Sequence, residues 1–112
     1  MSDFQITRLP QLVVEIIRCV DDSFPGWVEC ALQDAWGKEH TFIDKILIFT
    51  TSDLNGSSRY PQPGVIVCQA IRRWQDPQGR EIVTIDIEHP CGVESNSGET
   101  RFDILAAQLT EG

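Results

Sequence analysis

Alternation of apolar and polar residues constrains this chain most, because it supports strands and no other regular element. In WVECALQDA (27–35), Val28, Cys30 and Leu32 alternate with other side chains, which is typical of a strand with one buried face. EIVTIDIEH (81–89) repeats this pattern. No segment carries the 3.6-residue apolar stripe of an amphipathic helix. The sequence therefore predicts an all-β fold.

Turn residues divide the chain into strands of similar spacing, which indicates how the fold closes. At 112 residues the chain suits a single domain over residues 1–112. We predict a small, partly open antiparallel barrel of about six strands, whose alternate residues share one core. The expected strands cover residues 12–20, 27–35, 40–50, 65–74, 81–89 and 101–105. Asp44 and Lys45 interrupt the third strand, where we expect a bulge or a change of sheet.

Two polar segments are predicted to be loops. TSDLNGSSRYPQPG (51–64) combines Asn-Gly, serines and prolines, a composition that no regular element tolerates. PCGVESNSGET (90–100) is the second. The residues after 105 form a helical turn or a frayed end in this interpretation. Long loops in compact domains often carry function, so Arg59 and Tyr60 in the first loop are candidate contact residues.

The charge of the chain excludes some partners. It has 9 basic and 17 acidic residues, a formal net charge of -8. That charge opposes binding to nucleic acids and to anionic membranes. It is compatible with a protein partner, and it favours a basic one. Neither a signal peptide nor an apolar run of membrane-spanning length is present. We therefore predict a cytoplasmic protein with four reduced cysteines.

HPCGVES (89–95) places a histidine and a cysteine two residues apart. Pro90 cannot continue the hydrogen bonds of a central strand, so the favoured interpretation is that a strand ends here. His89 would then be partly buried, and Cys91 would pack against the core as a small apolar residue. The alternative is a thiol-dependent enzyme, in which His89 or His40 activates Cys91 as a thiolate.

Motifs for metals and cofactors are missing from the sequence. Structural zinc sites usually combine paired ligands at short spacing, and only His89 and Cys91 have such a spacing. No glycine-rich phosphate loop or calcium loop is present. The carboxylates Asp86, Glu88 and Asp103 fit a solvated strand face better than an acid–base pair. We predict no metal and no cofactor, and we favour a binding protein over an enzyme.

Aromatic residues supply the best candidates for a binding surface. Tryptophan, tyrosine and arginine are enriched at the energetic centres of protein interfaces. For the tryptophans themselves, the favoured interpretation is that they close the ends of a small barrel, and a role in binding is the alternative. The candidate protein-binding residues are Trp27, Trp36, Arg59, Tyr60 and Trp74. The predicted function is a protein-binding module that acts by surface complementarity; a carrier of a small ligand is a further hypothesis.

Three segments carry a resemblance to other proteins. GWVECALQDAWGKEHTFIDK (26–45), YPQPGVIVC (60–68) and GVESNSGETRFDI (92–104) follow one another in this order. The arrangement resembles short bacterial all-β domains of uncharacterised function. Some proteins of that kind resemble immunity proteins, which neutralise a toxin by binding it. The resemblance implies an immunity-like inhibitor of a toxin as one specific form of the binding hypothesis.

Overall fold

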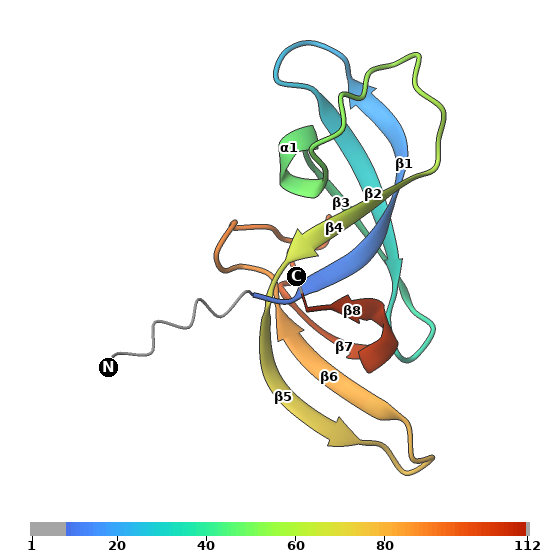
Figure 1. The fold of residues 1–112 in the computed structure, drawn as a ribbon, viewed down its shortest axis with the longest axis vertical. Helices are drawn as coiled ribbons and strands as arrows, with labels where there is room; N and C mark the ends of the chain where they lie inside the picture. Colours follow the sequence, from blue (N-terminus) through green and yellow to red (C-terminus); the bar gives the residue numbers. More distant parts are fainter. Residues whose placement is uncertain (1–8, 112) are drawn as a thin grey trace, which may run out of the picture.

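The computed structural model describes residues 9–111 and confirms the all-β prediction (Figure 1). Within these residues the strands form two antiparallel sheets, and the sheets do not close into a barrel. The partly open architecture is therefore confirmed. Residues 9–111 form eight strands instead of about six, because one predicted strand is divided in two and the segment after residue 105 adds another.

The first sheet has the order β3-β2-β1-β4, and β8 also pairs with β1. β1 bends between the other strands, with register shifts between Ile16 and Arg18 and between Cys19 and Asp21. Such bulges bend a strand and increase its local twist. The strands of this sheet are β1 (Gln11–Asp21), β2 (Trp27–Gln33), β3 (Glu39–Lys45), β4 (Gln62–Val67) and β8 (Leu109–Thr110).

The second sheet has the order β5-β6-β7. Its strand β5 follows β4 of the first sheet directly along the chain. It contains β5 (Gln69–Gln75), β6 (Glu81–Asp86) and β7 (Arg101–Leu105). Figure 1 shows β4 running on into β5. The prediction of one strand over 65–74 is wrong, since the chain changes sheets at Cys68. This residue is fully buried, and its backbone N–H donates to the carbonyl of Pro10 at 3.0 Å.

Two further segments differ from the sequence prediction. The expected strand over 40–50 ends at Lys45, and one helical turn follows, α1 (Ile46–Phe49). The turn buries both Ile46 and Phe49, because residues three apart lie on one face of a helix. The predicted interruption near Lys45 is thus a strand end. At the C-terminal end, a 3-10 turn (Ala106–Gln108) leads into β8.

Both sheets contribute alternate residues to one core. Val28, Cys30 and Leu32 of β2 are buried, as their alternation predicted. Phe42 of β3 and Phe102 of β7 meet edge to face across the two sheets, with ring centroids 5.8 Å apart. The core therefore holds the sheets against each other.

Three turns of one type shape the hairpin and loop tips. In each, a side-chain oxygen of the first residue accepts backbone N–H groups of the third and fifth residues at 2.8–3.2 Å. The fourth residue is a glycine with φ between 79° and 83°, a conformation that other residues avoid. The turns are DAWGK (34–38), DPQGR (76–80) and SNSGE (95–99).

The tip of the β2–β3 hairpin docks on the second sheet. The backbone N–H of Ala35 donates to the carbonyl of Asp103 in β7 at 2.8 Å. Gln108 Nε2 donates to the carbonyl of Gln33 at 2.8 Å. Because these bonds fix the hairpin against β7, side chains from the two sheets meet at this edge.

Candidate functional site

A row of four side chains, two adjacent tryptophans with an arginine at each end, lies where the β2–β3 hairpin meets the second sheet. The Cζ atom of Arg72 is 5.0 Å from the ring centroid of Trp74. The rings of Trp74 and Trp36 are 6.2 Å apart. Arg80 Cζ is 5.4 Å from the ring of Trp36. These separations fall within the range of cation–π and aromatic contacts. We call Arg72, Trp74, Trp36 and Arg80 the Arg–Trp row.

Strand geometry and turn geometry together position the row. Arg72 and Trp74 are two residues apart on β5, so both side chains lie on the same face of the sheet. Their partners on β6 are Thr84 and Ile82. The other two members come from turns of the type described above: Trp36 is the third residue of DAWGK, and Arg80 is the last residue of DPQGR.

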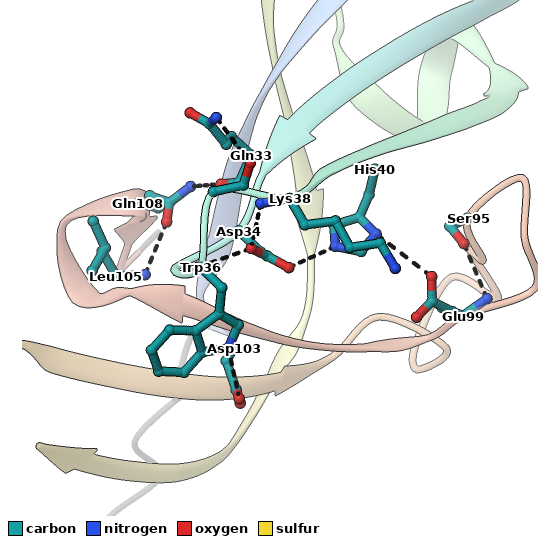
Figure 2. A network of polar contacts seen from close by, with 11 residues as sticks. Gln33, Asp34, Trp36, Lys38, His40, Ser95, Glu99, Asp103, Leu105 and Gln108 are labelled. Carbon is teal, nitrogen blue, oxygen red and sulfur yellow. Dashed lines mark hydrogen bonds and ion pairs between the residues drawn. The ribbon is translucent and has the colours of Figure 1, made fainter. Parts of the chain in front are cut away.

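Asp103 fixes both indole rings of the row. Trp36 Nε1 donates to Asp103 Oδ2 at 3.3 Å (Figure 2). Trp74 Nε1 donates to Thr84 Oγ1 at 3.1 Å, and that hydroxyl donates to Asp103 Oδ1 at 2.6 Å. Since both N–H groups are satisfied, the ring faces are held in place without depending on a partner. Asp103 was predicted to be merely a solvated carboxylate.

The two arginines of the row differ in their surroundings. Arg80 Nε donates to Asp76 Oδ2 at 2.8 Å, and its Nη1 donates to the carbonyl of Ala35 at 3.2 Å. Arg72 is exposed and forms no ion pair with any residue of 9–111. Trp36 is 51% exposed. The bonds of Arg80 to Asp76 and Ala35 hold the two hairpins together, so this arginine has a structural role. That role does not explain why Trp36 is half-exposed or why Arg72 has no ion-pair partner among residues 9–111.

A second polar network surrounds His40, beside the row (Figure 2). This histidine is buried in β3, with its ring 4.5 Å from that of Phe102. His40 Nε2 lies 2.8 Å from Asp34 Oδ2, and Nδ1 lies 3.6 Å from Glu99 Oε1. The two carboxylates contact opposite ring nitrogens, so they do not converge on one point. Residues 9–111 contain no group of three or more ligands placed to hold a metal ion.

The carboxyl of Asp34 predicts how stability depends on pH. Burial acts to raise its pKa, but hydrogen bonds from His40 and from two backbone N–H groups outweigh burial and lower it. The ionised form therefore stabilises the fold above the unfolded-state pKa, and this stabilisation is lost as the pH falls through the lower, folded-state pKa. Asp34→Asn should reduce the free energy of unfolding at neutral pH and flatten its decline in acid.

Urea denaturation at a series of pH values down to below 3.8, the ordinary pKa of an aspartate, measures this effect. The matched control is Asp53→Asn, which removes an exposed carboxylate from the loop before β4. Its pH profile should run parallel to that of the wild type. A parallel profile for Asp34→Asn would show that the carboxylate of Asp34 does not stabilise the fold.

The structure confirms that a strand ends before HPCGVES, but the predicted burial there is wrong. β6 ends at Asp86, and His89 and Cys91 are both exposed. The chain turns outward after Ile87, and Val93 packs in the core in place of the cysteine. His89 Nδ1 lies 3.6 Å from Asp86 Oδ2, a carboxylate that is itself buried rather than solvated.

The candidate thiol site is not assembled by these contacts. His40 contacts Asp34, Glu99 and Phe102, as described above. Within the part of the chain that the structure describes, no hydrogen bond joins Cys91 to His40 or His89. These contacts therefore do not support the hypothesis of a thiol-dependent enzyme.

Thiol reactivity should follow burial. Burial raises the pKa of Cys30 to about 12 and that of Cys68 to about 11, and both side chains are inaccessible. Iodoacetamide at neutral pH should modify the exposed Cys91 first and leave the two buried thiols intact until the protein unfolds. Peptide mass spectrometry over time measures the rates, with the urea-denatured chain as control. If Cys91 reacted faster in the folded than in the denatured chain, an activated thiol would be indicated instead.

The remaining candidate binding residues do not contact the Arg–Trp row through any interaction described above. Trp27 is half-buried at the start of β2. Arg59 is exposed in the loop before β4, whereas Tyr60 packs against the core and its hydroxyl donates to the carbonyl of Asn55 at 2.8 Å. The structure brings Trp36 and Trp74 together. Sequence reasoning missed Arg72 and Arg80, although the Arg-x-Trp spacing on a strand could have indicated the first.

Comparisons with family models, curated proteins and solved structures found no match to this chain. The resemblance to short bacterial domains therefore stays a prediction. Among residues 9–111, no helix has the length and apolar character needed to cross a membrane.

Proposed function

We propose that this chain is a protein-binding module and that the Arg–Trp row is its contact surface. The observation that carries the proposal is the half-exposed Trp36, held in place by Asp103 and flanked by Trp74 and Arg80. Tryptophan and arginine are the residue types that most often dominate the energy of an interface.

Preorganisation explains how such a surface would bind. The hydrogen bonds to Asp103 and Thr84 already fix the two indole rings. Ordering a side chain on binding costs about 0.5–1.5 kcal/mol, and a ring that is already held avoids most of that cost. The row can therefore offer apolar area to a partner without a change in the backbone.

The proposal includes a location in the cytoplasm and a partner of basic overall charge. The four cysteines are free, as expected in the reducing cytoplasm. The net charge of -8 would speed encounter with a partner of opposite overall charge. An immunity-like inhibitor that captures a toxin is one specific version.

Site-specific photo-crosslinking in the producing cells tests the proposal. A photoreactive amino acid at Lys38, an exposed residue in the turn that carries Trp36, should capture a protein partner. The same probe at Phe24, which is 99% exposed in the β1–β2 turn, is the matched control. Capture should be lost when Trp36→Ala is added to the Lys38 probe.

The captured protein, identified by mass spectrometry and purified, then gives a dissociation constant. Trp36→Ala should weaken binding by about 30-fold or more, as expected for a residue at the centre of an interface. Phe24→Ala should leave the affinity unchanged. Equal affinities for the Trp36→Ala variant and the wild type would contradict the proposal.

A further inference from the structure

Of the two arginines in the Arg–Trp row, only Arg80 has a carboxylate partner among the described residues. Asp76 neutralises Arg80 through a 2.8 Å ion pair. Asp103 accepts bonds from Trp36 and Thr84. Arg72, in contrast, has no carboxylate within 4.0 Å among residues 9–111. Within the described part of a strongly acidic chain, Arg72 is therefore an unpaired cation beside the indole ring of Trp74.

Among residues 9–111, no group accepts a hydrogen bond from the guanidinium of Arg72. Its guanidinium lies over the ring of Trp74. A guanidinium that stacks through its face keeps its N–H groups free at its edge, where they match the two oxygens of a carboxylate. The adjacent indole of Trp36 offers a surface for an apolar or aromatic side chain.

Among the described residues, no strand pairs with the outer edge of β5, the strand that carries Arg72. β5 is the outermost strand of its sheet, and between Gln69 and Gln75 it forms no backbone hydrogen bond to any described residue outside β6. An extended peptide can pair with such an edge through its main chain and place alternate side chains on the neighbouring surface.

We infer that the Arg–Trp row and the edge of β5 bind an extended, acidic segment of a protein partner. This inference rests on the proposed function and names the chemistry of the partner. A carboxylate of the segment pairs with Arg72, and a neighbouring apolar or aromatic side chain packs on Trp36. The prediction of a basic partner came from the net charge of the whole chain. The contacts at the Arg–Trp row depend on nearby charges, because charges in solution are screened beyond about 8 Å. A partner that is basic overall can therefore bind here through an acidic segment.

Other charged partners fit this surface less well. A basic segment would place cations against Arg72. A nucleic acid would bring a long row of phosphates into the field of a chain with a net charge of -8, which repels polyanions. A short peptide with one or two carboxylates beside an apolar side chain meets little of that repulsion.

A phage-displayed library of random linear peptides tests the inference. The baits are the wild type, Arg72→Gln, Trp36→Ala and the control Arg59→Gln, which removes an exposed arginine in the loop before β4. The wild type and the control should enrich peptides with Asp or Glu near an aromatic or aliphatic residue. Arg72→Gln should lose the acidic preference and keep the apolar one. Trp36→Ala should lose the enrichment.

The affinity of one enriched peptide, measured by fluorescence anisotropy, completes the test. Arg72→Gln should weaken it by about tenfold or more, the loss expected for a charge-assisted hydrogen bond, and Arg59→Gln should not. Thermal melting confirms that each variant is folded. Enrichment without an acidic preference, equal affinities for the two arginine variants, or no enrichment over Trp36→Ala would overturn the inference. Crosslinking at Lys38 that depends on Trp36 would still support the proposed function in each case.

Discussion

Phe102→Ala is expected to lower the free energy of unfolding by about 3–5 kcal/mol, the usual cost of truncating a buried phenylalanine. The ring is 4% exposed and belongs to the second sheet. It contacts Phe42 and His40 of the first sheet at centroid distances of 5.8 and 4.5 Å. Removal of the ring thus leaves a cavity between the sheets and also withdraws the aromatic wall beside the buried histidine.

Equilibrium denaturation in urea measures this loss. Phe102→Leu keeps most of the volume and should cost less than half as much. Ile43→Ala on β3 is the surface control, because this side chain is 39% exposed, and it should cost less than about 1 kcal/mol. If Phe102→Ala cost no more than Ile43→Ala, the two sheets would not depend on this contact.

Gly26→Ala should cost about 2–4 kcal/mol, because two penalties combine at this turn. Gly26 has a φ of 85°, in the left-handed region that favours glycine. A Cβ atom there would also lie 2.6 Å from Cδ1 of Ile46 in α1. Since Ile46 is buried, it has little room to move away.

Two variants separate these penalties. Gly37 has a similar φ of 83°, but a Cβ atom at this position would meet nothing within 4 Å. Gly37→Ala therefore reports the backbone penalty alone, about 1–2 kcal/mol. Adding Ile46→Val to Gly26→Ala removes the Cδ1 atom and should make the double variant more stable than the sum of the two single changes predicts. Equal losses for Gly26→Ala and Gly37→Ala would rule out the steric contribution.

Alternation predicted most of the fold because each regular strand buries one face. The strand over 101–105 was predicted with its observed bounds, and the buried residues of β2 followed from parity. The change of sheets at Cys68 was not predicted. VIVCQAIRRW (65–74) contains no glycine or proline, so no turn residue marks the point where the chain changes sheets. The pairing of each half with a distant strand does not follow from local composition.

The candidate site was predictable residue by residue but not as an arrangement. Trp36 and Trp74 were identified by type. Their contact depends on the hairpin that docks on β7 through Ala35 and Asp103, which sequence spacing does not reveal. The burial predicted for His89 and Cys91 was wrong because parity applies only within a strand, and β6 had already ended.

The pairing of β1 with β8 has a consequence for synthesis of the chain. Leu12 pairs with Leu109, so the ribosome makes this part of β1 well before the strand that pairs with it. Until β8 emerges, that part of β1 offers unpaired backbone groups to any strand nearby, which is the condition under which nascent chains associate wrongly. Translation that stalls before β8 therefore leaves a chain with an open edge, a species that chaperones and proteases would have to manage.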